Sequence, residues 1–393
     1  MPSSDHPPAR WFASAARLGA VALLLTGFLC TCDRAQRTPD VGERTPGVRQ
    51  PLAYATGFSI DRYANYVRLS VNAARPGATD TLRYYLYAGA EPPPDLPPGG
   101  LAVATPVRRV VLTSTTDLPL LEALDRTATL VGFPQPAYAA SPWVAEGVAA
   151  GRIRDLGGAE QLPPGPVLAV RPDLVVGYAT GADPYAALHR VGLPVVMNGS
   201  WLEAHPLGRA EWIKFVAAFY GLDEAADRVF DRIRRAYEAT AARAAAAGHR
   251  PRVLAGSLYR DVWYAPGGGS YMARLFADAG LDYAWATTAQ TGSLSLGLES
   301  ALVEAQRAER WVLPTTATTL GALLAENPHY AALPPVTADR VYATGLPRGA
   351  RRWSFFEHGS LRADLVLADL VRIGHPRLGV ADSLTFYRQL SAE

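Results

Sequence analysis

The feature that most constrains the fold is a long helical segment in the middle of the chain. Residues 223–247 contain neither Gly nor Pro, and their apolar residues from Ala226 to Tyr237 follow the helical period. At 1.5 Å per residue the segment forms a rod of roughly 37 Å, with Asp223 expected as its N-cap. Residues 209–220 predict a separate helix just before it. A long surface helix within a single domain is the alternative interpretation.

Short apolar runs alternate with helical patterns on both sides of this segment. Strands are predicted at residues 110–112, 174–176, 195–197, 253–255, 311–313 and 341–342. Helices are predicted at residues 118–124, 184–191, 271–279 and 361–372, and from residue 319. This alternation is typical of parallel sheets covered by helices. The sequence therefore predicts an α/β fold with two Rossmann-like lobes joined by a single long backbone helix.

The segment before the first lobe carries a different pattern. Residues 66–71 and 82–87 alternate and are rich in aromatic residues, which predicts a β-hairpin, and the Pro-rich residues 91–100 separate this hairpin from the first lobe. The predicted domains are a signal peptide (1–31), a polar tether (32–51), a β-hairpin appendage (52–104), an N-terminal lobe (105–208), a helical connector (209–248, with the backbone helix at 223–247) and a C-terminal lobe (249–393).

The first thirty residues have the layout of a secretory signal. Arg10 and Arg17 precede an apolar run at residues 18–29, which is shorter than the about 20 residues that span a bilayer. Cys30 and Cys32, the only cysteines, follow this run directly. We expect a lipoprotein signal in which Cys32 rather than Cys30 is lipidated, and an exported protein anchored to a membrane in the periplasm or at the cell surface. An ordinary cleaved signal with incidental cysteines is the alternative.

Composition excludes several functional classes. With 38 basic and 36 acidic residues the net charge is +2, which gives no reason to expect nucleic acid as a partner. The seven histidines are scattered, so no metal-ligand cluster is expected, and Gly-x-Ser-x-Gly and His-Glu-x-x-His motifs do not occur. We therefore expect neither a catalytic residue, nor a resident metal, nor a cofactor, and we expect a monomer.

Several stretches in a fixed order carry a family resemblance. They are residues 108–124 with 130–133, Val170-Arg171-Pro172-Asp173-Leu174-Val175-Val176, residues 191–196, residues 251–254 with 263–271, and Leu298-Glu299-Ser300-Ala301-Leu302. Together they resemble the ABC-transporter solute-binding proteins for iron siderophores, haem and cobalamin. In that family two lobes are joined by one stiff helix, and the family has a Lys-Pro-Asp-Leu-Val strand and a Leu-Glu-x-x-Leu segment at matching places.

The resemblance implies a function. The chain is expected to capture a small-molecule metal chelate, an iron siderophore, haem or cobalamin, in the inter-lobe cleft and deliver it to an ABC permease. The alternatives are an exported chelate scavenger or sensor without its own permease, or an enzyme on the same two-lobe scaffold. Neighbouring genes for a permease and an ATPase would distinguish these alternatives.

The candidate ligand-binding residues follow the predicted strands, because ligands of open α/β sheets sit at the carboxyl ends of the strands. They are Ser114, Thr115, Thr116, Phe133, Tyr178, Asn198, Trp201, Tyr259, Trp263, Tyr264, Ser270, Arg348, Arg352, Trp353 and Phe356. Large flat ligands need aromatic walls and a few polar groups. Core packing is the alternative role for each aromatic residue. The arginines are expected either to clamp a ferric complex or to lie in a solvated loop.

Two smaller features have open alternatives. The glycines at 267–269 before Ser270 predict either an anion cradle or a tight turn that lets the backbone approach the ligand. The resemblance also implies one surface Glu on each lobe that docks on the permease, and Glu299 occupies that place in the second lobe. In the first lobe the matching position is Gly165, and Glu160 is expected to substitute for it.

Overall fold

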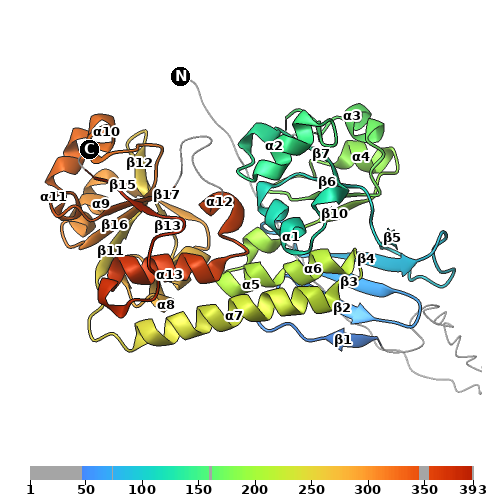
Figure 1. Ribbon diagram of the computed structural model, residues 1–393, viewed down its shortest axis with the longest axis horizontal. Coiled ribbons are helices and arrows are strands. Elements are labelled where there is room, and N and C mark those ends of the chain that lie inside the picture. Colours follow the sequence, from blue (N-terminus) through green and yellow to red (C-terminus); the bar gives the residue numbers. More distant parts are fainter. Residues whose placement is uncertain (1–46, 73, 159–161, 345–353, 392–393) are drawn as a thin grey trace, which may run out of the picture. The chain divides into compact units, whose positions relative to one another are not determined.

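The computed structural model describes residues 47–72, 74–158, 162–344 and 354–391 (Figure 1). The predicted signal peptide with Cys30 and Cys32, most of the predicted tether, Glu160, Arg348, Arg352 and Trp353 lie outside these residues. Across the described ranges, no helix has both the length and the apolar character needed to cross a membrane.

The segment before the first lobe is a five-stranded sheet in the order β1-β2-β3-β4-β5. Its strands are β1 (Val48–Gln50), β2 (Phe58–Arg62), β3 (Val67–Asn72), β4 (Thr81–Ala88) and β5 (Leu101–Thr105). The predicted hairpin is present as β3 and β4, but it is only part of this sheet. Strand β1 lies inside the predicted tether and pairs with β2, where Arg49 forms an ion pair with the buried Asp61. The Pro-rich residues 91–100 are the connection that returns the chain to β5, parallel to β4.

The first lobe is a parallel sheet in the order β10-β9-β6-β7-β8. Its strands are β6 (Val110–Leu112), β7 (Leu130–Phe133), β8 (Arg154–Asp155), β9 (Leu174–Gly177) and β10 (Val195–Met197). Its helices are α1 (Leu118–Ala123), α2 (Pro142–Ala149), α3 (Pro164–Ala169) and α4 (Ala186–Arg190). The chain runs from β6 to one edge of the sheet and returns through β9 to the other edge. The topological switch point therefore lies between β6 and β9.

The predicted helix at residues 209–220 is wrong in one respect, because it is two helices. These are α5 (Pro206–Glu211) and α6 (Ile213–Ala218), with a break at Trp212. Trp212 is fully buried, and its indole N–H donates to the Glu203 carboxylate at 3.0 Å. Helix α7 (Asp223–Ala245) then forms the single long connecting helix of the fold, as predicted. Leu222 is its N-cap, so Asp223 instead lies in the first turn, where a negative charge favours the helix dipole.

Two buried carboxylates near α5 bind the segment that leads into β2. Glu211 accepts hydrogen bonds from the backbone N–H groups of Ala53, Tyr54 and Ala55, at distances from 2.8 to 3.1 Å. Glu203 accepts those of Thr56 and Gly57 at 2.9 and 2.8 Å. Five consecutive backbone donors thus have ionised acceptors, which make stronger hydrogen bonds than neutral ones. We call Glu203, Glu211 and residues 53–57 the carboxylate clamp.

The only lysine of the chain completes the carboxylate clamp. The Lys214 ammonium lies 3.1 Å from the Glu211 carboxylate and 3.1 Å from Asp227 of α7. It also lies 4.9 Å from the centre of the Phe230 ring. A buried carboxylate needs such a partner, because an unpaired buried charge is costly. Lys214 therefore connects the clamp to the long helix.

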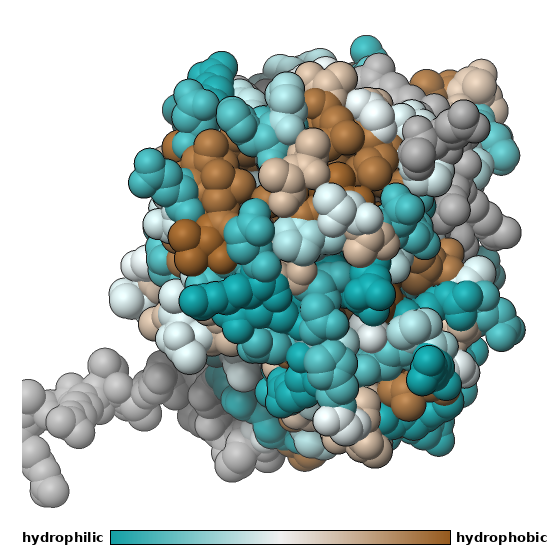
Figure 2. Space-filling view, turned by 90° about the vertical axis from the view of Figure 1, so that its left-hand side faces the viewer, coloured by the Kyte–Doolittle hydropathy of each residue, from teal (hydrophilic) through white to brown (hydrophobic). Residues whose placement is uncertain are grey.

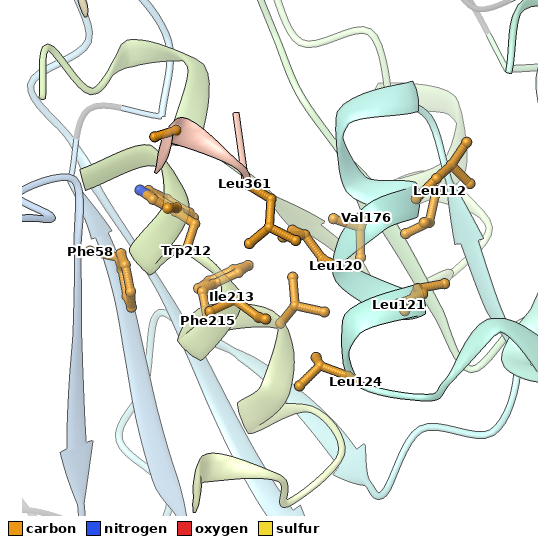
Figure 3. Close-up of a cluster of buried hydrophobic side chains, with 14 of the residues drawn as sticks. Phe58, Leu112, Leu120, Leu121, Leu124, Val176, Trp212, Ile213, Phe215 and Leu361 are labelled. Atoms are coloured by element: carbon orange, nitrogen blue, oxygen red, sulfur yellow. The ribbon is translucent and has the colours of Figure 1, made fainter. Parts of the chain in front are cut away.

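A continuous core joins the N-terminal sheet, the short helices and the first lobe. Phe58 of β2 contacts Trp212 with ring centres 4.6 Å apart, and Phe215 of α6 lies between that pair and the leucines of α1 (Figure 3). Leu112 and Val176 of the first-lobe sheet continue the same cluster. Helices α5 and α6 are therefore packed between two sheets, which explains why nearly all of their residues are buried.

The second lobe contains a sheet in the order β14-β11-β16-β17-β18, parallel except for β18. Its strands are β11 (Arg252–Ala255), β14 (Asp282–Tyr283), β16 (Arg310–Pro314), β17 (Val341–Thr344) and β18 (Arg388–Gln389). A second sheet contains β12 (Ser257–Tyr259), β13 (Val262–Pro266) and β15 (Ser293–Gly297). The helices are α8 (Tyr271–Asp278), α9 (Leu298–Ala305), α10 (Leu320–Glu326), α11 (Pro334–Thr337), α12 (Phe355–His358) and α13 (Ala363–Gly374).

The glycine run before α8 serves the packing of two backbones. A Cβ atom on Gly267 would lie 2.2 Å from the Gln290 carbonyl oxygen, and one on Gly268 would lie 2.5 Å from those of Ala286 and Thr288. The predicted tight turn is present, because the Ser270 backbone N–H donates to the Gly267 carbonyl at 3.0 Å. The backbone approaches residues 285–292 there, which the sequence did not predict.

Removal of one clamp carboxylate should weaken the whole protein. Glu211→Ala leaves three backbone N–H groups without their acceptor and removes the buried partner of Lys214, so we expect a loss of about 3 kcal/mol in the free energy of unfolding. Urea denaturation followed by tryptophan fluorescence measures this loss. Glu224→Ala, which removes an exposed carboxylate of α7, is the control and should change stability by less than about 0.5 kcal/mol. Equal stabilities of the two variants would contradict the role of the clamp.

Candidate functional site

The first lobe gathers polar candidate residues at its switch point. Ser114, Thr115 and Thr116 follow β6, and Tyr178 follows the neighbouring strand β9. The Ser114 hydroxyl accepts a hydrogen bond from the Thr116 backbone at 3.3 Å and lies 2.7 Å from the Thr116 hydroxyl. Tyr178 is 36% exposed, and its backbone N–H and carbonyl both bond the hydroxyl of Tyr185. The structure therefore brings these four predicted residues to one end of the sheet.

A buried polar pair lies directly behind these residues. The Asn198 side-chain amide, just after β10, donates to the Asp117 carboxylate at 2.6 Å. Burial raises the pKa of Asp117 to about 7, although the hydrogen bond from Asn198 lowers it. Asn198 is only 3% exposed. It therefore supports the turn that holds Thr115 and Thr116 and offers a ligand no surface, contrary to its predicted role in binding.

The second lobe has a cavity at its own switch point. The cavity has a volume of about 240 Å³ and is bordered by the carboxyl ends of β11 and β16, between which the strand order reverses. Tyr264 and Phe356, both predicted ligand residues, line it, and they are 41% and 56% exposed. Tyr271, Met272 and Phe355 line it as well. Apart from tyrosine hydroxyls, the described residues that line this cavity carry no ionisable side chain.

The strand β13 explains why Tyr264 faces outward. Arg260 and Asp261 adopt φ values of 46° and 63°, which is the geometry of a two-residue hairpin turn. That turn pairs Tyr264 with Ser257 on one side, and β15 pairs it with Ser295 on the other. Because successive side chains of a strand alternate between faces, the outer face carries a tyrosine flanked by hydroxyls.

Three predicted ligand residues are core or capping residues instead. Trp263 is fully buried, stacks on Trp311 at 5.8 Å and donates to the Ala255 carbonyl. Phe133 is 2% exposed inside β7. Ser270 caps α8 by accepting from the Ala273 backbone N–H. Burial leaves these side chains no surface to offer a ligand, contrary to their predicted role.

The remaining predicted residues lie apart from the second-lobe cavity. Tyr259 is 59% exposed at the tip of the hairpin but does not line the cavity. Trp201 is half-buried in the turn after β10, and its indole N–H has no hydrogen-bond partner in the described part of the chain. Glu299 is exposed in the first turn of α9, and Val303 on the same helix is 57% exposed. Figure 2 shows one face of the second lobe, where apolar patches lie between hydrophilic residues.

Two contacts that reach across the site were missed by sequence reasoning. Glu357 of α12 is 2% exposed and accepts hydrogen bonds from the backbone N–H groups of Ala140 and Ser141 in the first lobe, and from the Ser141 hydroxyl. Burial raises the pKa of Glu357, and the hydrogen bonds from Ser141 and Ala140 lower it. Helix α12 also packs on the turn at Thr115–Asp117. Nothing in the sequence distinguishes this glutamate from a solvated one.

The second missed contact joins α5 to α8. The Arg209 guanidinium lies 3.5 Å from the centre of the Tyr271 ring and donates to the carbonyls of Trp201 and Glu203 at 2.6 and 3.1 Å. Tyr271 lines the second-lobe cavity, so Arg209 fixes one wall of that cavity from the first-lobe side. Within the described ranges, no group of three His, Cys, Asp or Glu side chains is arranged to hold a metal ion.

Comparisons with known proteins agree with this fold. The family model for periplasmic binding proteins matches residues 110–346, more than half of the chain. An uncharacterized lipoprotein of Methanocaldococcus jannaschii is 25% identical over 307 residues, which cover 74% of this chain and 70% of that one.

Two solved structures share the fold. The apo form of the periplasmic heme-binding protein RhuT from Roseiflexus sp. RS-1 gives a TM-score of 0.51 at 18% identity, covering 68% of this chain and 97% of its own. The ABC-type Fe3+-hydroxamate transport system of Saccharomonospora viridis gives 0.52 at 20% identity, covering 68% and 93%. The chain belongs to the periplasmic binding protein family.

Proposed function

We propose that this protein captures an iron chelate, a siderophore or haem, or else cobalamin, and delivers it to the permease of an ABC importer. The observation that carries the proposal is the cavity at the second-lobe switch point, where Tyr264 and Phe356 present exposed aromatic surface. A cavity of this kind suits the flat or apolar part of a large chelate. The comparison structures named for heme and for Fe3+-hydroxamate transport support this ligand class.

The polar residues of the first lobe supply the complementary half of the proposed site. Ser114, Thr115 and Thr116 offer hydroxyls, which both donate and accept hydrogen bonds. The buried pair of Asp117 and Asn198 holds their turn in place, and α12 packs on the same turn while its Glu357 binds Ser141. A site whose parts are held before the ligand arrives loses less entropy on binding.

Delivery is proposed to involve the exposed Glu299 and the lipid anchor. Glu299 stands at the start of α9 with no ion pair among the described residues, so its carboxylate is available to a basic permease surface. Lipidation at Cys32 would keep the protein at the membrane that holds the permease. The lipoprotein from Methanocaldococcus jannaschii supports this anchor.

Ligand binding can be tested with a panel of ferric hydroxamate, haem and cobalamin. One of them at about 100 times its Kd should add about 2.7 kcal/mol to the stability of the folded state and raise the unfolding temperature. Tyr264→Ala should then weaken binding about tenfold, because the ligand loses an aromatic wall. Leu168→Ala, an exposed apolar change on α3, is the control. A panel without any stabilising member would contradict the proposed ligand class.

Permease docking requires a transport assay. Glu299→Ala should reduce uptake of the identified ligand at least about threefold while its Kd stays unchanged, because the lost charge lies outside the cavity. Glu326→Ala, an exposed carboxylate of the same lobe, should leave uptake unchanged. Normal uptake by the Glu299 variant would remove this residue from the docking surface.

The buried pair predicts a defined pH dependence. Because the pKa of Asp117 is raised from 3.8 to about 7, the folded protein binds one more proton than the unfolded chain between these values. This group's contribution to stability should therefore decrease by about 1.4 kcal/mol for each pH unit from about 4 to about 7. Asp117→Asn removes the titration and keeps an acceptor for Asn198. The stability difference between variant and wild type, measured by urea denaturation, should grow with pH over this interval; a constant difference would show that Asp117 does not titrate there.

A further inference from the structure

A second cavity, larger than the one described above, lies between the N-terminal sheet and the first lobe. Its volume is about 480 Å³, and strands β4 and β5 form one wall while the edge strand β10 forms the other. None of the predicted ligand residues within the described ranges lines it. Strands β4 and β5, which form one wall, lie before residue 110 and so outside the part of the chain that matches the family model. The N-terminal sheet, and not the part that matches the family model, therefore forms one wall of this cavity.

The inner surface of the cavity is apolar and firmly assembled. Leu82 and Leu101 come from the N-terminal sheet, and Val195 and Met197 come from β10. The Tyr84 hydroxyl accepts a hydrogen bond from the Met197 backbone N–H at 2.9 Å, in a buried position between the two walls. That bond satisfies a donor on the free edge of the sheet, which would otherwise be open to another strand. An extended peptide is consequently a poor ligand for this cavity. The Met197 N–H that would bond an added strand already donates to the Tyr84 hydroxyl.

The rim of the cavity carries two guanidinium groups that form no ion pair within the described residues. Arg75 is half-buried and Arg83 is exposed, and neither forms an ion pair or side-chain hydrogen bond within the described residues. Of the two acids at the rim, Asp183 lies 3.6 Å from the His189 ring, and Asp80 is exposed just before β4. Paired guanidinium donors bind a carboxylate or sulfonate well. The two arginines at the rim, unpaired among the described residues, are therefore available to an anionic group.

We infer that this cavity is a second binding site, which takes a small amphipathic organic anion. A carboxylate or sulfonate would receive paired N–H donors from Arg75 and Arg83, as guanidinium geometry favours. The apolar body of the ligand would lie on Leu82, Leu101 and Met197. The volume falls in the range of small-molecule sites. This inference does not depend on the chelate proposed for the inter-lobe site.

The test uses 8-anilinonaphthalene-1-sulfonate, an aromatic sulfonate whose fluorescence rises when it leaves water. The double variant Arg75→Gln/Arg83→Gln should weaken its binding about tenfold or more, and Leu101→Trp should abolish binding by filling the cavity. Arg152→Gln/Arg154→Gln removes the same charge from exposed positions near β8, at the opposite edge of the first-lobe sheet, and should leave binding unchanged. Thermal unfolding of each variant verifies that it is folded.

Tyr264→Ala separates the two cavities. If the probe binds in the cavity at the N-terminal sheet, this variant should retain the wild-type Kd. The inference is overturned if Tyr264→Ala loses the probe, if the Arg75 and Arg83 double variant binds within about twofold of wild type, or if the control double variant weakens binding to the same extent. The chelate panel is scored separately, so failure of one site is distinguishable from failure of the other.

Discussion

The carboxylate clamp is the constraint on which the rest of the structure depends. Two glutamates accept five consecutive backbone N–H groups, and one lysine connects Glu211 to the long helix. Backbone donors buried without an acceptor would cost far more than the same groups in water. By supplying those acceptors, the clamp allows an irregular segment to lie against α5 and brings Phe58 onto Trp212. The clamp thus joins the N-terminal sheet, the short helices and α7 to one another.

Helix α5 also supports the site. Arg209 belongs to α5, the short helix that also carries Glu211. Its guanidinium packs on the Tyr271 ring, which lines the second-lobe cavity. On the other side of the site, Glu357 ties α12 to the start of α2. Both contacts cross between segments that are far apart in sequence and use charged groups with several hydrogen bonds each. Charge-assisted bonds of this kind fix direction as well as distance, which suits a site that must recognise a rigid ligand.

Periodicity was sufficient to predict the fold class and the connecting helix, because both follow from local apolar patterns. Tyr264 and Phe356, two of the aromatic candidates chosen from predicted loops, line the second-lobe cavity. Sequence reasoning could not tell that Trp263 is buried and Tyr264 exposed. Which of two adjacent strand residues faces the core depends on where the core lies, and the sequence does not show this. The neighbour of the glycines at 267–269 could not be predicted for a similar reason. A close backbone contact requires glycine whether the contacting group is a ligand or another part of the chain. Glu357 and Arg209 were missed because long-range ion contacts leave no local pattern.

The sequence separation of the clamp bears on when the chain can fold. Ala53 meets Glu211 across 158 positions, and Ser141 meets Glu357 across 216. Contacts that close such long loops form late and slow the folding of a domain. The N-terminal sheet cannot be anchored until α5 has been synthesised, and the first lobe lacks its last support until α12 emerges. A nascent chain of this sequence therefore stays without its final tertiary structure through most of translation.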